Sequence, residues 1–466
     1  MNKIFTKKIN WNPNSPQEKL AVTLISKLSK SGFKTFIVGG YVRDLLLRRK
    51  ETGAIDLATN ATPQQVTKKL EKDYKVVPTG IKHGTVTVVK AGSEIEITTF
   101  RKEGKYLDAR HPKKVKYIKD QSQDASRRDF TINALYLDVI KKEVIDYVGG
   151  FSDLKKKTLR FVGAPDKRIK EDALRLMRAV RFASVFGFKL EPKAIEIIRK
   201  NAKLLKKISA ERIKQELDKI VKFKNRSRGV VMLLKFGLLK QILPEIEQMN
   251  HTVQSQNYHS EGNVFVHTML ALDLVESDAD LTTLYGLLLH DLGKIVTLVK
   301  TRRKGRAHTS FYGHQHKGVE MASNLLNRLR FSNAETEDIL WYIKNHHVPY
   351  EITKMRKSKQ MSWGLEDRFE NLLKIFRADS LATIPTDKKG RKLKPDMRSY
   401  YKAVSIMKRA RGRKVLQKPL LSGNDVMRVL KVKEGPVVGR ALRRVREAQL
   451  AGKLKTKTAA IKFLKK

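Results

Sequence analysis

Apolar and polar positions follow both a strand-like and a helix-like period in the first part of the chain. Residues 18–30 carry apolar side chains at helical spacing, and a second, shorter helix is expected over 42–47. Short runs rich in β-branched residues predict strands. The expected strands are 36–38, 76–77, 85–89, 94–99, 129–138 and 144–147. The pattern therefore predicts an α/β region that ends at about residue 155.

Helical periodicity dominates from Ile169 onward. Residues 173–186 and 210–221 form strongly periodic patterns, and Gly187 is well placed to end the first of these helices. Helical patterns resume after a polar, irregular stretch at 242–260 and continue from Val264 to about Phe376. We therefore expect an α+β protein in four parts. The parts are a head with a mixed sheet (1–157), a helical neck (158–245), a helical body (246–385) and a basic helical tail (386–466).

The charge balance of the chain points to a polyanionic partner. The sequence holds 98 Lys and Arg against 47 Asp and Glu, a formal net charge of +51, and the excess is spread along the chain. Lysine and arginine side chains displace condensed counterions from a phosphate backbone, which favours nucleic-acid binding. Charge alone does not separate DNA, RNA and a membrane surface, and a solubility adaptation to high salt is the alternative.

The chain contains no cysteine. This excludes disulfides, thiolate metal sites and a cysteine nucleophile, and it fits a reducing cytoplasm, where we expect the protein. No run of about 18 apolar residues is present, so we expect no membrane partner. Residues 1–14 lack the apolar core of a signal peptide. The oligomeric state stays open at this point.

A glycine pair follows the first expected strand of the head. Gly39 and Gly40 allow the backbone to approach a phosphate closely, and the helix that follows offers free N–H groups at its N-terminus. Arg43 lies in the first turn of that helix. A simple tight turn would explain the glycine pair alone. The next expected strand, however, carries an acidic residue, Asp56, and is followed by a Thr-Pro turn.

Residues 36–63 resemble the head motif of class II tRNA nucleotidyltransferases and bacterial poly(A) polymerases, within the polymerase-β superfamily. The resemblance implies template-independent addition of C, C and A to tRNA from CTP and ATP, with Mg²⁺. In that family two aspartates one residue apart on a strand face the same side and hold two metal ions. Here Asp56 is present and Ala54 stands in the place of the first aspartate.

Three interpretations of Ala54 stay open. They are a deliberate Asp-to-Ala change, a natural variant that reaches its metal differently, and a slipped alignment. The loss of one metal ligand is expected to cost on the order of 10³-fold in rate or more. Glu96 is a candidate third carboxylate, and a solvated strand acid is the alternative for it.

Two further segments are similar to the family. Its Arg-Arg-Asp motif contacts the ribose and triphosphate of the incoming nucleotide, and the matching residues are Arg127, Arg128, Asp129 and Asn133. Its Glu-Asp-x-x-Arg motif selects the base. The matching residues, together with a neighbouring arginine at helical spacing, are Glu171, Asp172, Arg175 and Arg178.

The resemblance implies a separate role for each residue of the neck motif. Asp172 would accept from an exocyclic amine, Arg175 would donate to the base, and Glu171 would orient Arg175. An ordinary salt-bridged helix is the alternative for this segment.

Histidines and aspartates recur through the body in the order typical of an HD-domain metal site. The principal set is His267, His290, Asp291 and Asp379, and His314 and His346 would serve a second metal. Imidazole and carboxylate ligands suit Mg, Mn, Ni, Fe or Zn, and such sites activate water for phosphoester hydrolysis. A metal-free relic that serves only the fold is the alternative.

Basic side chains of the tail resemble the family's tRNA-elbow contact. They are Arg443, Arg444, Lys453 and Lys455, and a solvated basic surface is the alternative for them. Two other activities stay open: a bacterial poly(A) polymerase or partial CC- or A-adding enzyme, and an HD phosphohydrolase whose head only binds RNA.

Overall fold

The computed structural model describes residues 4–49, 53–81, 84–103, 115–255, 258–303 and 306–466. The chain forms two compact units, Met1–Ile220 with Met232–Ile242 and Val221–Val231 with Leu243–Lys466. Each unit is described by itself.

An eight-stranded mixed sheet forms the centre of the head, in the order β1-β10-β9-β2-β3-β6-β5-β4. Within this sheet, among the described residues, β3 and β6 pair in parallel and the other neighbouring strands pair antiparallel. The strands are β1 (Phe5–Lys8), β2 (Thr35–Val38), β3 (Asp56–Thr59), β4 (Lys75–Gly80), β5 (Thr85–Lys90), β6 (Ser93–Thr99), β9 (Leu135–Asp138) and β10 (Glu143–Asp146). Phe36, Phe100 and Tyr136 meet in a buried aromatic cluster on this sheet.

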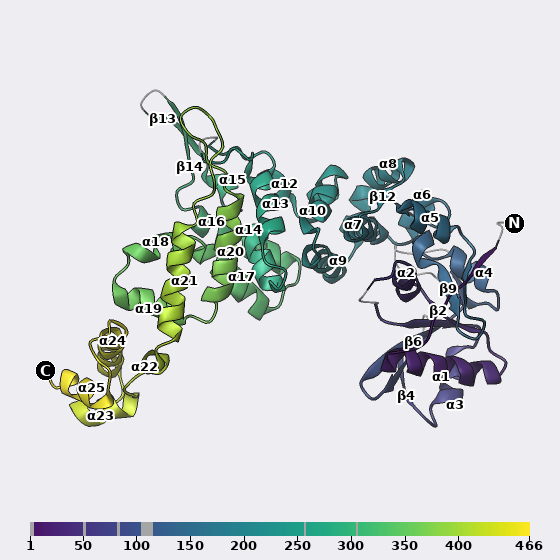
Figure 1. The fold of residues 1–466 in the computed structure, drawn as a ribbon, viewed down its shortest axis with the longest axis horizontal. Coiled ribbons are helices and arrows are strands. Elements are labelled where there is room, and N and C mark those ends of the chain that lie inside the picture. The colour runs from purple at the N-terminus through teal and green to yellow at the C-terminus, as the bar shows by residue number, and fades with distance from the viewer. Residues whose placement is uncertain (1–3, 50–52, 82–83, 104–114, 256–257, 304–305) are drawn as a thin grey trace. The chain divides into compact units, whose positions relative to one another are not determined.

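Short helices flank the sheet, and α1 and α3 contact one another and its strands (Figure 1). Helices of the head are α1 (Pro16–Lys30), α2 (Gly40–Leu46), α3 (Pro63–Leu70), α4 (Gln121–Ser126) and α5 (Gly150–Lys156). Capping boxes begin two of them, since the Ser15 side chain accepts from Glu18 N and the Thr62 side chain accepts from Gln65 N. A separate two-stranded pair, β7 (Arg101–Glu103) and β8 (Val115–Tyr117), extends from the head.

The rest of the first unit is helical. Its elements are α6 (Pro165–Glu171), α7 (Arg175–Phe186), α8 (Pro192–Asn201), α9 (Ala210–Lys222), α10 (Arg226–Lys235) and α11 (Leu239–Ile242), with a short strand pair, β11 (Thr158–Leu159) and β12 (Lys189–Leu190). Helix α10 passes from one unit into the other. Leu176, Val180 and Ala183 are fully buried at helical spacing on α7, which explains why this pattern forms a helix.

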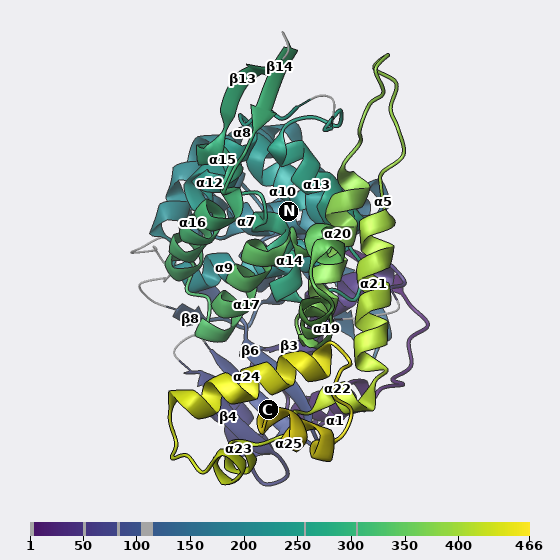
Figure 2. The same ribbon diagram turned by 90° about the vertical axis from the view of Figure 1, so that its left-hand side faces the viewer.

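The second unit consists of helices and one hairpin. The helices are α12 (Pro244–Met249), α13 (Val264–Leu274), α14 (Leu281–Leu289), α15 (Lys294–Thr297), α16 (His314–Arg328), α17 (Asn333–Asn345), α18 (Val348–Glu351), α19 (Lys357–Leu365), α20 (Phe369–Ala382), α21 (Arg398–Arg411), α22 (Lys414–Gln417), α23 (Gly423–Leu430), α24 (Pro436–Leu450) and α25 (Lys457–Leu464). The hairpin consists of β13 (Val299–Arg303) and β14 (Arg306–Ser310). Helices α23, α24 and α25 share a small core around Val426, Val445 and Ala460 (Figure 2).

The predicted fold class is confirmed, and four local expectations differ from the structure. The expected strand 129–138 begins only at Leu135, because Thr131–Asn133 forms a 3-10 turn. The expected helix 173–186 begins at Arg175. The expected irregular stretch 242–260 contains α12, and a hairpin interrupts the helices expected between Val264 and Phe376. The four domain boundaries stay a prediction.

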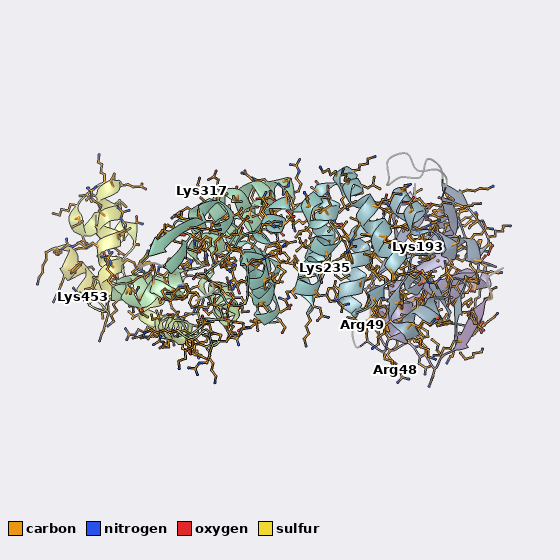
Figure 3. All side chains as sticks on the ribbon, turned by 90° about the horizontal axis from the view of Figure 1, so that it is seen from above. Arg48, Arg49, Lys193, Lys235, Lys317 and Lys453 are labelled. Carbon is orange, nitrogen blue, oxygen red and sulfur yellow. The ribbon has the colours of Figure 1, made fainter. Side chains whose placement is uncertain are left out.

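Among the described residues, none of the helices combines the length and the apolar character needed to cross a bilayer. Basic side chains project from both units, and Arg48, Lys193, Lys317 and Lys453 are examples (Figure 3).

Candidate active sites in the head and the body

The acidic residues of the head lie beside one another on β3 and β6. Asp56 pairs with Glu96 in the parallel register. Ala54 is exposed and Asp56 half-buried, whereas Ile55 and Leu57 are 2% and 0% exposed, so positions 54 and 56 face the same side of the chain. Burial and the charge of Glu96 raise the pKa of Asp56 to about 6, while Arg128 opposes the shift.

The glycine turn, Arg128 and Asp56 converge at one point. Gly39 has φ 78° at the N-cap of α2, a conformation that favours glycine. A Cβ on Gly39 would lie 3.7 Å from Arg128 Nη1 and 4.0 Å from Asp56 Oδ2. The two neighbouring carboxylates, Asp56 and Glu96, therefore fit a divalent cation, because hard cations prefer oxygen ligands. Ala54 supplies no ligand atom.

A buried carboxylate that sequence reasoning missed holds the two predicted arginines. Asp124 accepts from Arg127 Nε at 2.7 Å and from Arg128 Nη2 at 3.2 Å. Tyr136 OH donates to the same carboxylate at 2.6 Å. The sequence does carry a signal for this contact. Asp124 precedes Arg127 by three residues and Arg128 by four, which is the spacing of ion pairs on a helix.

Asp129 connects the predicted nucleotide-binding residues of the head and the neck. It accepts from Arg178 Nε at 2.8 Å and from Asn133 Nδ2 at 3.2 Å. Asn133 in turn accepts from Arg43 Nη1 at 2.6 Å. The Arg43 guanidinium also donates two hydrogen bonds to the Asp44 carboxylate and stacks over the ring of Phe186. The structure therefore brings these residues together in one network.

The base-selection motif spans the end of one helix and the start of the next. Glu171 ends α6 and Arg175 begins α7, with Asp172 in an extended conformation at φ −143°. Arg175 Nη1 donates to Glu171 Oε2 at 3.0 Å, and Nη2 donates to the backbone carbonyl of Arg127 at 3.3 Å. The expected contact between Glu171 and Arg175 is therefore present. The alternative of one ordinary salt-bridged helix does not fit this segment, because α6 ends at Glu171 and α7 begins at Arg175.

The principal histidines and aspartates of the body also come together. His267 on α13, His290 at the end of α14 and Asp379 on α20 form one cluster, with His267 Nε2 2.8 Å from Asp379 Oδ1. The Nδ1–H of His290 donates to the Leu287 carbonyl at 2.7 Å, so that in the neutral ring Nε2 carries the lone pair that a metal ion would use. This buried Nε2 makes no hydrogen bond in the described part of the chain and lies 3.2 Å from Asp291 Oδ2.

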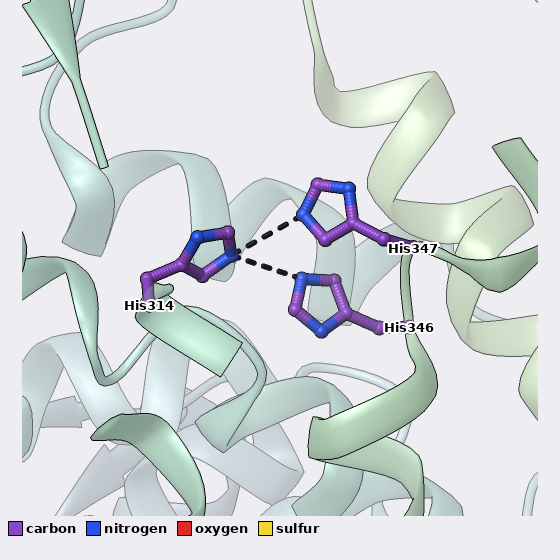
Figure 4. Close-up of side chains that lie close together, drawn as sticks. All are labelled: His314, His346 and His347. Atoms are coloured by element: carbon purple, nitrogen blue, oxygen red, sulfur yellow. Dashed lines mark hydrogen bonds between the residues drawn. The ribbon is translucent and has the colours of Figure 1, made fainter. Parts of the chain in front are cut away.

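A second group of histidines lies next to this cluster. His314 Nε2 is 3.2 Å from the Nε2 atoms of both His346 and His347 (Figure 4). The Nδ1 atoms of His314 and His346 donate to backbone carbonyls, so their Nε2 lone pairs face each other. Burial lowers the pKa of His314 to about 4, which keeps its ring neutral.

Lone pairs that face each other at this distance fit a cation between them. Imidazole nitrogen and carboxylate oxygen together form a donor set for a transition metal. Asp291 connects the two groups, because its Oδ1 lies 3.6 Å from His314 Nε2. The sequence analysis named His346 and assigned no role to His347, whereas both lie at the same distance from His314 Nε2.

Glu261 is a further residue that the sequence did not single out. Its Oε1 accepts from the Nδ1 atoms of His259 and His267 at 2.7 and 2.9 Å. This bond fixes the tautomer of His267, so that Nε2 faces the cluster.

The basic residues of the tail lie on two neighbouring elements. Arg443 and Arg444 are exposed on α24, and Arg444 stacks over the Phe463 ring at 4.9 Å. Lys453 and Lys455 are exposed in the following turn.

Three domain families match the chain in order. The poly A polymerase head domain matches residues 35–160, the probable RNA and SrmB-binding site of polymerase A matches 187–249, and the HD domain matches 258–384. The chain thus carries a poly A polymerase head domain, the probable RNA-binding segment of such polymerases and an HD domain. The resemblance drawn from the head, neck and body motifs is thereby confirmed.

Curated proteins similar to this chain include CCA-adding enzymes. That of Lactobacillus delbrueckii subsp. bulgaricus is 44% identical over 221 residues, 47% of this chain and 54% of the relative. The chain thus spans about half the length of the curated relatives it matches. A solved Bacillus stearothermophilus CCA-adding enzyme in complex with CTP is 26% identical, with a TM-score of 0.73, over 97% of this chain and 98% of that one. A Thermotoga maritima CCA-adding enzyme complexed with tRNA shares the fold at 18% identity and a TM-score of 0.60, over 97% and 96%.

Proposed function

We propose that this protein adds C, C and A to the 3′ end of tRNA, with CTP and ATP as substrates. The observation that carries the proposal is the convergence of Asp56, Arg128 and the Gly39 turn in the head. CCA-adding enzymes among the relatives support it, and one of them was solved with CTP and another with tRNA. The four parts of the chain, with the boundaries given above, are proposed as its domains.

The head would bind and orient the triphosphate. Asp56 and Glu96 would hold Mg²⁺, which activates the primer hydroxyl and neutralises the leaving pyrophosphate when it is bound. Arg127 and Arg128 donate charge-assisted hydrogen bonds to phosphate oxygens. The backbone at Gly39 and Gly40 leaves room for the phosphates to approach.

The neck would select the base. Asp172 is an acceptor for the exocyclic amine that cytosine and adenine share, and Arg175 is a donor to ring nitrogen or carbonyl. Glu171 and the Arg127 carbonyl already hold the Arg175 guanidinium in place. Arg175 therefore needs little reorganisation when a nucleotide binds.

Ala54 would impair this chemistry. A methyl group stands where the family carries a carboxylate, on the side of the strand that Asp56 also faces. The expected loss is on the order of 10³-fold in rate. Binding of tRNA is expected to persist, because a residue change at position 54 leaves every basic side chain in place.

The test measures incorporation of labelled CTP and ATP into tRNA that lacks its CCA end. Unchanged protein, Ala54→Asp and the uncharged isostere control Ala54→Asn are compared. We expect only Ala54→Asp to extend the tRNA efficiently, by C, C and A. Equal activity of all three would show that this carboxylate is not needed, and a long A tract would favour a poly(A) polymerase.

A second activity, phosphoester hydrolysis at the HD centre, is favoured by the facing lone pairs of His290, His314 and His346. These side chains with His267, Asp291 and Asp379 would hold one or two transition-metal ions, which activate water when bound. Release of phosphate from a nucleoside 2′,3′-cyclic phosphate, with Mn²⁺ or Ni²⁺ added, tests it. If hydrolysis is found and Ala54→Asp adds no nucleotide, the nucleotidyl-transfer proposal fails and hydrolysis stands alone.

A further inference from the structure

Asp124 of the head accepts hydrogen bonds from four partners among the described residues. It lies on α4 and is 0% exposed. Its Oδ1 accepts from Arg127 Nε and from the backbone N–H of Arg101, and its Oδ2 accepts from Arg128 Nη2 and Tyr136 OH. A single buried carboxylate therefore touches both arginines that are proposed to bind the triphosphate.

Tyr136 completes the support of Arg128. Its hydroxyl oxygen accepts from Arg128 Nε at 3.1 Å while the hydroxyl hydrogen is donated to Asp124. The guanidinium carbon also lies 5.1 Å from the centroid of the Tyr136 ring. The Arg128 guanidinium is thus held at Nε, at Nη2 and on one face, while Nη1 is the nitrogen beside Gly39 and Asp56.

Charge explains why the support has to be anionic. Two adjacent guanidinium groups repel one another, and both side chains are largely buried, with 15% and 17% of their surfaces exposed. Burial alone would raise the pKa of Asp124, but the charges of Arg127 and Arg128 and the Tyr136 hydrogen bond hold it at about 2. The ionised carboxylate offsets one positive charge and leaves the other for a ligand.

We propose that Asp124 is a positioning residue for nucleotide binding, which fixes the guanidinium groups of Arg127 and Arg128 in the orientation that receives the triphosphate. The inference rests on the proposed function, because it takes these arginines as triphosphate ligands. Asp124 itself touches no substrate atom. A long arginine side chain that is already held loses less conformational freedom when its ligand binds.

A purely structural role would have different consequences. It would lower stability without changing affinity for phosphates in the folded protein. A positioning role changes phosphate affinity even where the fold is intact, and it affects CTP and ATP equally because the neck reads the base. Inorganic tripolyphosphate is then a suitable probe, since it has the phosphates without the base.

The experiment compares Tyr136→Phe and Asp124→Asn with Tyr147→Phe as the matched control. Tyr147 belongs to the same aromatic cluster, with its ring 5.9 Å from that of Tyr136, but its hydroxyl accepts from Gln121. Titration calorimetry on the full chain gives Kd for CTP, ATP and tripolyphosphate, and thermal unfolding gives Tm. We expect Tyr136→Phe and Asp124→Asn to raise all three Kd values about tenfold, with Tyr147→Phe unchanged.

The outcomes separate the possibilities. Tyr136→Phe decides the matter if Asp124→Asn does not fold. Unchanged Kd values in folded Tyr136→Phe, or a loss for CTP without a loss for tripolyphosphate, would overturn the positioning role. If the unchanged chain binds neither CTP nor ATP, the proposed function itself fails, and the inference fails with it.

Discussion

Arg212 of α9 donates a hydrogen bond from Nη2 to Asp172 Oδ2 over 3.1 Å. The other oxygen, Asp172 Oδ1, accepts from the backbone N–H of Leu174 at 3.1 Å. The aspartate proposed to read the base is therefore oriented from two sides, while 23% of its side chain stays exposed. Its direction is set by a residue of another helix, 40 positions later in the chain.

Arg212→Ala is expected to weaken base selection. Without this donor, Asp172 gains other rotamers, and its preference for a base with an exocyclic amine falls. We expect the ratio of kcat/KM for CTP over UTP to drop about tenfold, within the 1–3 kcal/mol of one good base contact. The measurement uses the Ala54→Asp background, and Lys222→Ala, an exposed lysine at the end of the same helix, is the control. An unchanged ratio would remove Arg212 from base selection.

Asp291→Asn is expected to remove metal from the HD centre. The carboxylate lies within 3.6 Å of His290 Nε2 and of His314 Nε2, so an amide in its place affects both groups. Metal affinity should fall by at least about 100-fold, since even changes behind the ligands cost 10–100-fold. Metal per chain is measured by mass spectrometry after loading with Ni²⁺ and dialysis.

The control for this variant is another aspartate of the same unit. Asp278 is exposed and pairs with Lys374 at 2.8 Å, away from the histidines, so Asp278→Asn should keep its metal. Nucleotide addition by the Ala54→Asp chain should survive Asp291→Asn. Full retention of metal by Asp291→Asn would show that Asp291 is not a ligand, and an unchanged chain that takes up no Ni²⁺ would show that the clustered side chains serve only the fold.

Local chemistry explains which parts of this structure were predictable. The glycine turn at Gly39 and the strand with Asp56 depend on residues next to one another, and they form where the pattern predicts them. Helix α7 begins later than its periodicity suggests, because the Asp172 side chain accepts from Leu174 N and caps the chain in an extended conformation. The spacing of apolar residues does not reveal that a side-chain hydrogen bond to the backbone competes with the first turn of the helix.

Long-range pairing accounts for most of the rest. Arg178 and Asp129 stand 49 positions apart and meet only because the neck folds back on the head. Glu261 and Asp124 carry no motif of their own, and their importance follows from the histidine and arginine side chains that they hold. The hairpin β13–β14 lies within the stretch from Val264 to about Phe376, for which only helices were expected.

Asp124→Asn is expected to remove a contribution to stability that depends on pH in a defined direction. The folded-state pKa of Asp124, about 2, lies below its ordinary value of 3.8. The carboxylate therefore stabilises the fold above about pH 4, and this contribution is lost as the pH falls toward 2. The shift corresponds to ~2 kcal/mol at neutral pH. Urea unfolding gives the free energy of unfolding of the unchanged chain and of Asp124→Asn. The difference between these two free energies should be smaller at pH 3 than at pH 7.

If the difference in the free energy of unfolding is the same at both pH values, the loss of stability in Asp124→Asn comes from packing and not from the charge of the carboxylate. Asp73→Asn is the matched control in the same domain, because Asp73 is exposed and forms a surface pair with Lys27. It is expected to change stability little at either pH, since water and salt screen such pairs.

The basic turn of the tail offers a test of tRNA binding. Lys453 and Lys455 are exposed on either side of buried Leu454, so replacing both with alanine changes charge without opening the core. If both contact phosphates, tRNA affinity falls and the slope of log K against log salt decreases by about one for each lost contact. Filter binding at several salt concentrations measures both quantities.

Lys344→Ala is the control for this pair, because Lys344 is an exposed lysine of the same unit on α17. The slope separates the two interpretations of the tail better than affinity does. A contact to phosphate releases counterions and alters the slope, whereas the loss of a distant positive charge lowers affinity by a weaker, general attraction. A slope that the double substitution leaves unchanged would make the turn a solvated basic surface, and Arg443 and Arg444 on α24 would then be the remaining candidates.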